Sequence, residues 1–352
     1  MIHERGLRPP AGTNANAKIA ASQSQRECLD VSLAAHTDAG GFLDLHRSLL
    51  DELRKTGRLS VPACAARPLV EGYRKIAIAD APSRTLLVDA GGGPVAVLFV
   101  SSAVDAGYVA RNLARAAEAR QMLGADLGSV ILDPLAWGET GGLSYAAWPW
   151  HRPRTRIRGL AYLQTRLLLP RLTSWLGGAT ERSARDPQRQ EIESAFVAPL
   201  ERMARDGRFE PASRQIATEG LERLRSGAWR PRVVLEHKAI LDNLLLPRDR
   251  AHRRQFPRGF ILIDWAGANL RGYAFANLLR IGQRSRLPAS NLRAELLRHC
   301  GILACDARDI MPYLLAATGF VGAHLGHFDE GFYVQMYREM LQFSHTVVRS
   351  LP

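Results

Sequence analysis

The spacing of apolar residues divides the chain into a β-rich first part and a helical second part. The first part shows, in order, a helical pattern at 41–57, β-prone runs at 73–79, 84–90 and 95–100, a helical pattern at 105–123, and further runs at 129–137 and 143–148. Turn residues separate the three β-prone runs, which predicts an antiparallel meander. The first part is therefore expected to be a small sheet accompanied by helices.

A proline-rich connector at 149–153 leads into the second part. Helical patterns cover 156–176, 188–205, 211–226, 289–303, 308–321 and 329–349, interrupted by β-like runs at 233–246 and 260–264. This order predicts an α+β protein with two lobes, a small antiparallel-sheet N-terminal lobe at 39–148 and a larger helical C-terminal lobe at 149–352. Residues 1–38 are mostly small and polar, and we expect them to form a disordered tail.

Two segments of the second part carry residue types that phosphoryl transfer needs. They read VVLEHKAILDNLLLP over 233–247 and FILIDWAGA over 260–268. Phosphoryl transfer requires metal ions held by an Asp and an Asn, a cation near the phosphates and a carboxylate that faces the attacking hydroxyl. In order and apolar frame, the segments resemble the catalytic loop and metal-binding turn of the aminoglycoside phosphotransferase and choline kinase family, which has a two-lobe protein kinase-like fold.

The resemblance covers about residues 70–280 and implies a cofactor and a reaction. By family, the chain would bind ATP and Mg²⁺ and transfer the γ-phosphate to the hydroxyl of a small molecule. The resemblance assigns Asn243 and Asp264 as metal ligands. It nominates Ser83, in the loop that the family fills with glycines, to face the phosphates, and Glu118, in the helix that reads RAAEARQML, as the acid that the family pairs with a strand lysine.

The catalytic loop departs from the family pattern at the position of the catalytic Asp. That position holds Lys238 when the loop is aligned on Asn243, and Ala239 when it is aligned on His237 with one residue deleted. The nearest carboxylate is Asp242, which would reach a substrate hydroxyl only in a rearranged loop. Lys238 and Asp242 are therefore the catalytic candidates, and Lys238 could also hold an anionic ligand or the γ-phosphate.

Two further positions differ from the family. Phe99 or Leu98 stands where the strand lysine belongs, and Asn277 replaces an Asp that braces the catalytic loop. These changes leave two interpretations open: a phosphotransferase whose activity is weak or rewired, and a pseudokinase that serves as a nucleotide- or partner-binding scaffold.

The formal net charge of +13 favours anionic partners. Arginines gather at 151–158 and 248–258, so a basic surface that binds nucleic acid or anionic lipid is a third interpretation. A GC-rich genome would also produce this arginine and alanine bias.

No apolar run approaches the roughly 20 residues of a membrane-spanning helix, and we expect a soluble, cytoplasmic protein. The four cysteines, Cys28, Cys64, Cys300 and Cys305, lack paired spacing and predict neither disulfides nor a zinc site.

Overall fold

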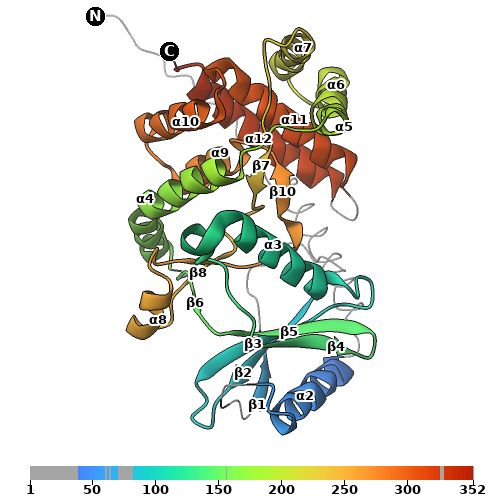
Figure 1. The fold of residues 1–352 in the computed structure, drawn as a ribbon, viewed down its shortest axis with the longest axis vertical. Helices are drawn as coiled ribbons and strands as arrows, with labels where there is room; N and C mark the ends of the chain where they lie inside the picture. Colours follow the sequence, from blue (N-terminus) through green and yellow to red (C-terminus); the bar gives the residue numbers. More distant parts are fainter. Residues whose placement is uncertain are drawn as a thin grey trace, which may run out of the picture.

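The computed structural model describes residues 39–59, 62, 65–69, 82–155, 157–325 and 329–351. An antiparallel sheet forms the N-terminal part, and the rest of the chain is mostly helical (Figure 1). This arrangement confirms the predicted α+β fold class. The tail expected at 1–38 and the strand expected at 73–79 lie outside the described residues.

The N-terminal sheet has five strands in the order β1-β2-β3-β5-β4. They are β1 (Ala65–Pro68), β2 (Ser83–Val88), β3 (Pro94–Val100), β4 (Ala136–Thr140) and β5 (Leu143–Pro149). The strand expected at 129–137 begins only at Ala136, because the preceding residues leave the sheet to reach the C-terminal part. One such contact is the hydrogen bond that Leu262 N donates to Val130 O at 2.8 Å.

Two helices cover opposite faces of this sheet. Helix α2 (Ala39–Lys55) packs its leucines against Leu98, whereas α3 (Tyr108–Gly128) packs Val109 against Phe99. In Figure 1 the sheet lies between α2 and α3. Because side chains alternate along a strand, Phe99 and not Leu98 faces α3.

The C-terminal part surrounds two small sheets with helices. Strand β7 (Val234–Glu236) pairs with β10 (Asn269–Gly272), and β8 (Leu244–Leu246) lies between β6 (Arg152–Pro153) and β9 (Ile261–Leu262). The helical elements are α4 (Arg158–Ser183), α5 (Arg189–Glu191), η1 (Ile192–Val197), α6 (Ala198–Arg205), α7 (Pro211–Arg225), α8 (Arg250–Gln255), η2 (Trp265–Gly267), α9 (Ala276–Ser285), α10 (Ala289–Leu303), η3 (Ala307–Asp309), α11 (Ile310–Ala323) and α12 (Glu330–Val348). Among the helices with described positions, none has the length and apolarity needed to cross a bilayer.

Helix α11 runs through the centre of the C-terminal core and crosses α6 at Gly319. A Cβ atom on Gly319 would lie 2.2 Å from Pro199 O and 2.8 Å from Pro199 C. We therefore expect Gly319→Ala to lower the free energy of unfolding by about 1–3 kcal/mol, because the two backbones must separate.

Urea denaturation measures this effect, and Gly301→Ala in α10 is the matched control. A Cβ atom on Gly301 meets nothing within 4 Å, so this control should raise stability by about 1 kcal/mol. Equal stability of Gly319→Ala and the unchanged protein would contradict the close helix crossing.

Candidate functional site

Asp264 occupies a strained turn directly after β9. Its backbone is left-handed, with φ 65° and ψ 61°, and it precedes the short helix η2. Residues other than glycine rarely adopt this backbone conformation, although aspartate is among those that tolerate it best. Such strain persists where neighbouring residues hold the backbone in place.

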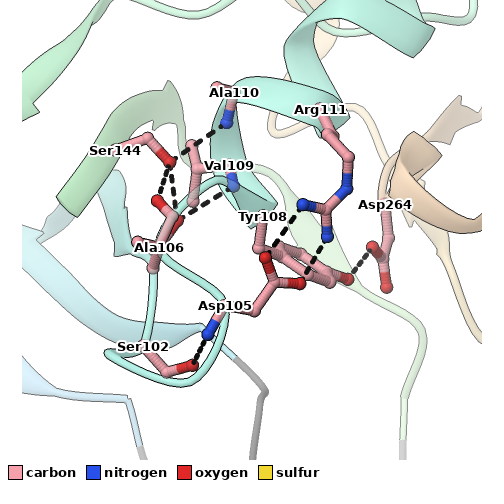
Figure 2. Close-up of polar contacts among 10 residues, drawn as sticks. Ser102, Asp105, Ala106, Tyr108, Val109, Ala110, Arg111, Ser144 and Asp264 are labelled. Atoms are coloured by element: carbon pink, nitrogen blue, oxygen red, sulfur yellow. Dashed lines mark hydrogen bonds and ion pairs between the residues drawn. The ribbon is translucent and has the colours of Figure 1, made fainter. Parts of the chain in front are cut away.

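Helix α3 supplies two of the contacts that hold this turn. The Tyr108 hydroxyl donates a hydrogen bond to Asp264 Oδ1 at 2.7 Å (Figure 2). Trp265 N donates to Asn112 Oδ1 at 2.8 Å. Tyr108 and Asn112 are four residues apart and therefore share one face of α3. The N-terminal part thus contacts the candidate metal ligand directly.

Serine hydroxyls hold the start of α3 in position. Val109 N donates to Ser101 Oγ at 3.0 Å and Ala110 N donates to Ser144 Oγ at 3.2 Å, while Ser144 Oγ donates to Ala106 O at 2.7 Å (Figure 2). These bonds satisfy N–H groups that the first turn of a helix leaves without partners. They fix the first turn of α3, including the tyrosine that reaches Asp264, to the ends of β3 and β5.

A buried histidine joins the catalytic-type loop to the Asp264 turn. His237 Nε2 lies 3.0 Å from Ile263 O, and the ring stands perpendicular to Trp265 with centroids 4.6 Å apart. Burial lowers the pKa of His237, so the ring is neutral and Nε2 carries the proton that it donates to the carbonyl. This bond fixes the residue that precedes Asp264.

The side chain of Asn277, at the start of α9, forms hydrogen bonds with both the backbone N–H and the backbone carbonyl of His237. With the amide oriented so that each of its atoms faces a complementary partner, the side-chain nitrogen donates to His237 O at 2.6 Å and the side-chain oxygen accepts from His237 N at 3.1 Å. An ionised aspartate could accept the second bond but could not donate the first. The Asn277 amide therefore braces the loop through two main-chain groups.

This double contact makes the cost of Asn277→Asp predictable. We expect the substitution to lower the free energy of unfolding by about 1–3 kcal/mol, because a buried carboxylate would face the His237 carbonyl. The loss should shrink as the pH falls, since a protonated carboxyl group can donate to that carbonyl. Urea denaturation over a range of pH measures both effects, and Asn291→Asp, at an exposed position of α10, is the control. A loss that does not change with pH would contradict the proposed contact.

Asn243 lies beside the Asp264 turn. Asn243 O accepts a hydrogen bond from Ile263 N at 3.0 Å, which places the residues just before β8 and just after β9 next to each other. The Asn243 side-chain nitrogen donates to Lys238 O at 3.4 Å. The structure thus places the backbone of Asn243 opposite Ile263, the residue that precedes Asp264.

The donor atoms of Asp264 and Asn243 suit Mg²⁺. The bond from Tyr108 occupies one oxygen of Asp264, and among the described residues nothing bonds to the amide oxygen of Asn243. Oxygen donors from one or two side chains, completed by phosphate oxygens, form the usual magnesium site. No cluster of three or more His, Cys, Asp or Glu side chains able to hold a metal occurs in the described part of the chain.

The two residues of the N-terminal part that were predicted to bind the cofactor lie away from Asp264. Ser83 Oγ donates to Val100 O at 3.0 Å and lies 3.0 Å from His46 Nε2, on the side of α2. Glu118 is exposed and pairs with Arg115 at 3.2 Å. It follows Tyr108 by ten residues, a distance of about 15 Å along α3. The structure brings neither residue to Asp264.

The two predicted catalytic residues are both exposed. Lys238 follows the clamped histidine, and Asp242 pairs with Arg284 of α9. Between them, Ala239 has a left-handed backbone with φ 58°. The carboxylate of Asp242 is therefore already engaged by a cation, whereas the position two residues after His237 carries only a methyl group.

A cation lies beside the strand position where the family has lysine. Arg84 of β2 pairs in register with Phe99 of β3, and its guanidinium carbon lies 4.7 Å from the centre of the Phe99 ring. Sequence reasoning did not single out Arg84, because the resemblance directed attention to a cation on the strand at 95–100. It also missed Tyr108 and Asn112, for which helical spacing of four residues was the available signal.

Comparison with solved structures identifies the fold. A GDP complex of a variant of aminoglycoside 2'-phosphotransferase-IIIa matches with a TM-score of 0.51 and 14% identity, covering 87% of this chain and 98% of that chain. The chain therefore has the kinase-like fold of aminoglycoside phosphotransferases, as the sequence predicted.

Two other matches have lower scores. They are an aminoglycoside phosphotransferase from Alicyclobacillus acidocaldarius (TM-score 0.43, 14% identity, 84% of this chain and 93% of that chain) and a putative fructosamine-3-kinase from Haemophilus somnus (0.42, 10%, 80% and 92%). No protein-family model matches the sequence, and no curated protein sequence does.

Proposed function

We propose that this chain binds a magnesium nucleotide and transfers its terminal phosphate to the hydroxyl of a small molecule, with Asp264 and Asn243 as the metal ligands. The observation that carries the proposal is the left-handed Asp264, which Tyr108 contacts and which lies beside Asn243. Asp264 and Asn243 would hold Mg²⁺, which would neutralise the negative charge of the phosphates. The GDP in the aminoglycoside 2'-phosphotransferase structure supports a nucleotide ligand, and ATP is the nucleotide we expect here.

The cation that orients the phosphates is Arg84 in this proposal. Its guanidinium lies over Phe99 on the face of the sheet that α3 covers, and Tyr108 projects from the start of the same helix toward Asp264. Phosphoryl transfer depends mainly on positioning and charge stabilisation, so an arginine from β2 can serve where the family uses a lysine from β3.

Transfer is expected to be slow, because the loop lacks an acceptor-facing carboxylate. Ala239 or Lys238 occupies that position, and Arg284 engages Asp242. The same observation favours a second function, a nucleotide-binding scaffold without catalysis. Lys238 is exposed on the loop and would then hold a phosphate group of the ligand.

A thermal-shift titration with ATP tests nucleotide binding. Transfer of labelled phosphate from ATP to candidate hydroxyl compounds tests catalysis. We expect ATP to raise the melting temperature only when Mg²⁺ is present, because the site offers oxygen ligands for the ion. A shift without turnover would select the scaffold. The absence of any shift at millimolar ATP would overturn both functions.

A further inference from the structure

Large apolar side chains are exposed on the first half of α4. Of the nine large apolar side chains that are exposed in the described part of the chain, five lie between residues 157 and 167. They are Ile157 (65% exposed), Leu160 (50%), Tyr162 (52%), Leu163 (53%) and Leu167 (68%). Scattered exposed apolar residues are normal, but a contiguous group marks an interaction surface.

Four of these side chains share one face of the helix. Ile157, Leu160, Leu163 and Leu167 are spaced by three, three and four residues, which aligns them along one side. The opposite side of α4 carries buried residues such as Leu169 and Leu172 and belongs to the C-terminal core. Packing in the C-terminal core therefore explains one apolar face of α4. It does not explain the exposed apolar face.

The structure also joins the two arginine-rich stretches of the sequence. Strand β6 pairs with β8, and Arg248 N donates to His151 Nδ1 at 3.3 Å. The rings of His151 and His252 lie 5.4 Å apart. Segments almost a hundred residues apart in the chain thus form one basic region, in which Arg250, Arg253 and Arg254 of α8 are exposed.

This basic region adjoins the start of α4. Strand β6 ends at Pro153, only a few residues before the helix, and Arg154 donates to Thr165 Oγ1 at 2.9 Å and to Leu241 O at 2.6 Å. In Figure 1, α8 and the start of α4 lie on the same side of the molecule. We call the four aligned apolar residues of α4 together with the three exposed arginines of α8 the α4–α8 surface.

The composition of the α4–α8 surface selects its partner. A two-fold dimer would present the same surface from both copies, and this surface contains no carboxylate that could neutralise the arginines of the other copy. Nucleic acid would satisfy the arginines but offers no apolar phase for four aliphatic side chains. The boundary between anionic headgroups and acyl chains satisfies both kinds of side chain.

We propose that the α4–α8 surface docks the protein onto an anionic lipid bilayer, with the α4 side chains in the headgroup region and the α8 arginines against lipid phosphates. Cosedimentation of the full chain with vesicles tests this proposal. We expect binding to vesicles of equal parts phosphatidylcholine and phosphatidylglycerol, weaker binding to pure phosphatidylcholine, and loss of binding as salt rises to about 0.5 M.

Two sets of variants separate the apolar and the charged contributions. The triple variant Leu160→Gln, Leu163→Gln, Leu167→Gln should reduce the vesicle partition coefficient roughly tenfold or more, with an unchanged melting temperature, because these side chains lie outside the core. Arg250→Gln, Arg253→Gln, Arg254→Gln should remove the preference for anionic vesicles. The matched control Val104→Gln, Trp137→Gln, Leu297→Gln changes exposed apolar residues elsewhere and should bind like the unchanged protein.

Four outcomes would overturn the proposal. The first two are the absence of binding to either kind of vesicle, and vesicle binding that the leucine variant does not reduce. The third is a dimer in solution that the leucine variant dissociates. The fourth is binding to duplex DNA that the leucine variant retains, without binding to vesicles.

Discussion

Asp264→Asn is expected to abolish the magnesium-dependent stabilisation by ATP while leaving the fold intact. Asparagine tolerates a left-handed backbone at least as well as aspartate, and its side-chain oxygen can still accept the bond from Tyr108. The substitution therefore removes the negative charge and little else. Since Mg²⁺ binds through charged oxygen ligands, we expect the affinity for the magnesium nucleotide to fall about a hundredfold or more.

Thermal shift at several ATP concentrations measures this loss, because stabilisation grows with the ratio of ligand concentration to dissociation constant. The matched control is Asp329→Asn, which makes the same chemical change at the N-cap of α12. There the side chain accepts a bond from Phe332 N, which an amide oxygen can also accept. Equal shifts in Asp264→Asn and in the unchanged protein would show that the nucleotide binds without this carboxylate.

Much of the fold was predictable because local patterns determine it. The strands expected at 84–90, 95–100 and 143–148 are present as β2, β3 and β5, with alternation that buries one face under each helix. Strand β1 was not expected at Ala65–Pro68, because a run of four residues that contains a proline carries little β signal. Its place in the sheet depends on pairing with β2.

The resemblance nominated Asn243 and Asp264, and the pairing of short strands explains why they lie close together. Asn243 directly precedes β8 and Asp264 follows β9, and these two strands pair in an antiparallel manner. The positions of Ser83 and Glu118 relative to Asp264 could not be predicted in this way. The helix that carries Glu118 has small or apolar residues on more than one side, so its sequence does not determine which face meets Asp264, and Tyr108 and Asn112 occupy that face.

The supports of the catalytic-type loop decide where a missing carboxylate could be restored. His237 is held in place within the loop, because its ring contacts Ile263 O and the side chain of Asn277 bonds to its backbone. Two residues further along lies Ala239, which the resemblance places at the position of a catalytic Asp when the loop is aligned on His237 with one residue deleted. The alternative, Lys238, directly follows the clamped residue and is exposed.

Ala239→Asp is therefore expected to raise the rate of phosphoryl transfer. The backbone of Ala239 is left-handed, with φ 58°, a conformation that aspartate adopts more readily than alanine, so the substitution should not destabilise the protein. A positioned general base contributes roughly 10²-fold to 10⁴-fold to the rate. With water as the acceptor, release of ADP from magnesium ATP measures the gain before any natural acceptor is identified.

Two controls make this result specific to position. Lys238→Asp introduces the same carboxylate one residue earlier and should give a smaller gain, because its side chain leaves the loop in a different direction. Asp242→Asn should leave ADP release unchanged, since the Asp242 carboxylate pairs with Arg284 and does not act as the base. If Ala239→Asp binds magnesium ATP normally and releases ADP no faster than the unchanged protein, the loop does not present residue 239 to the acceptor. The scaffold function would then be favoured over catalysis.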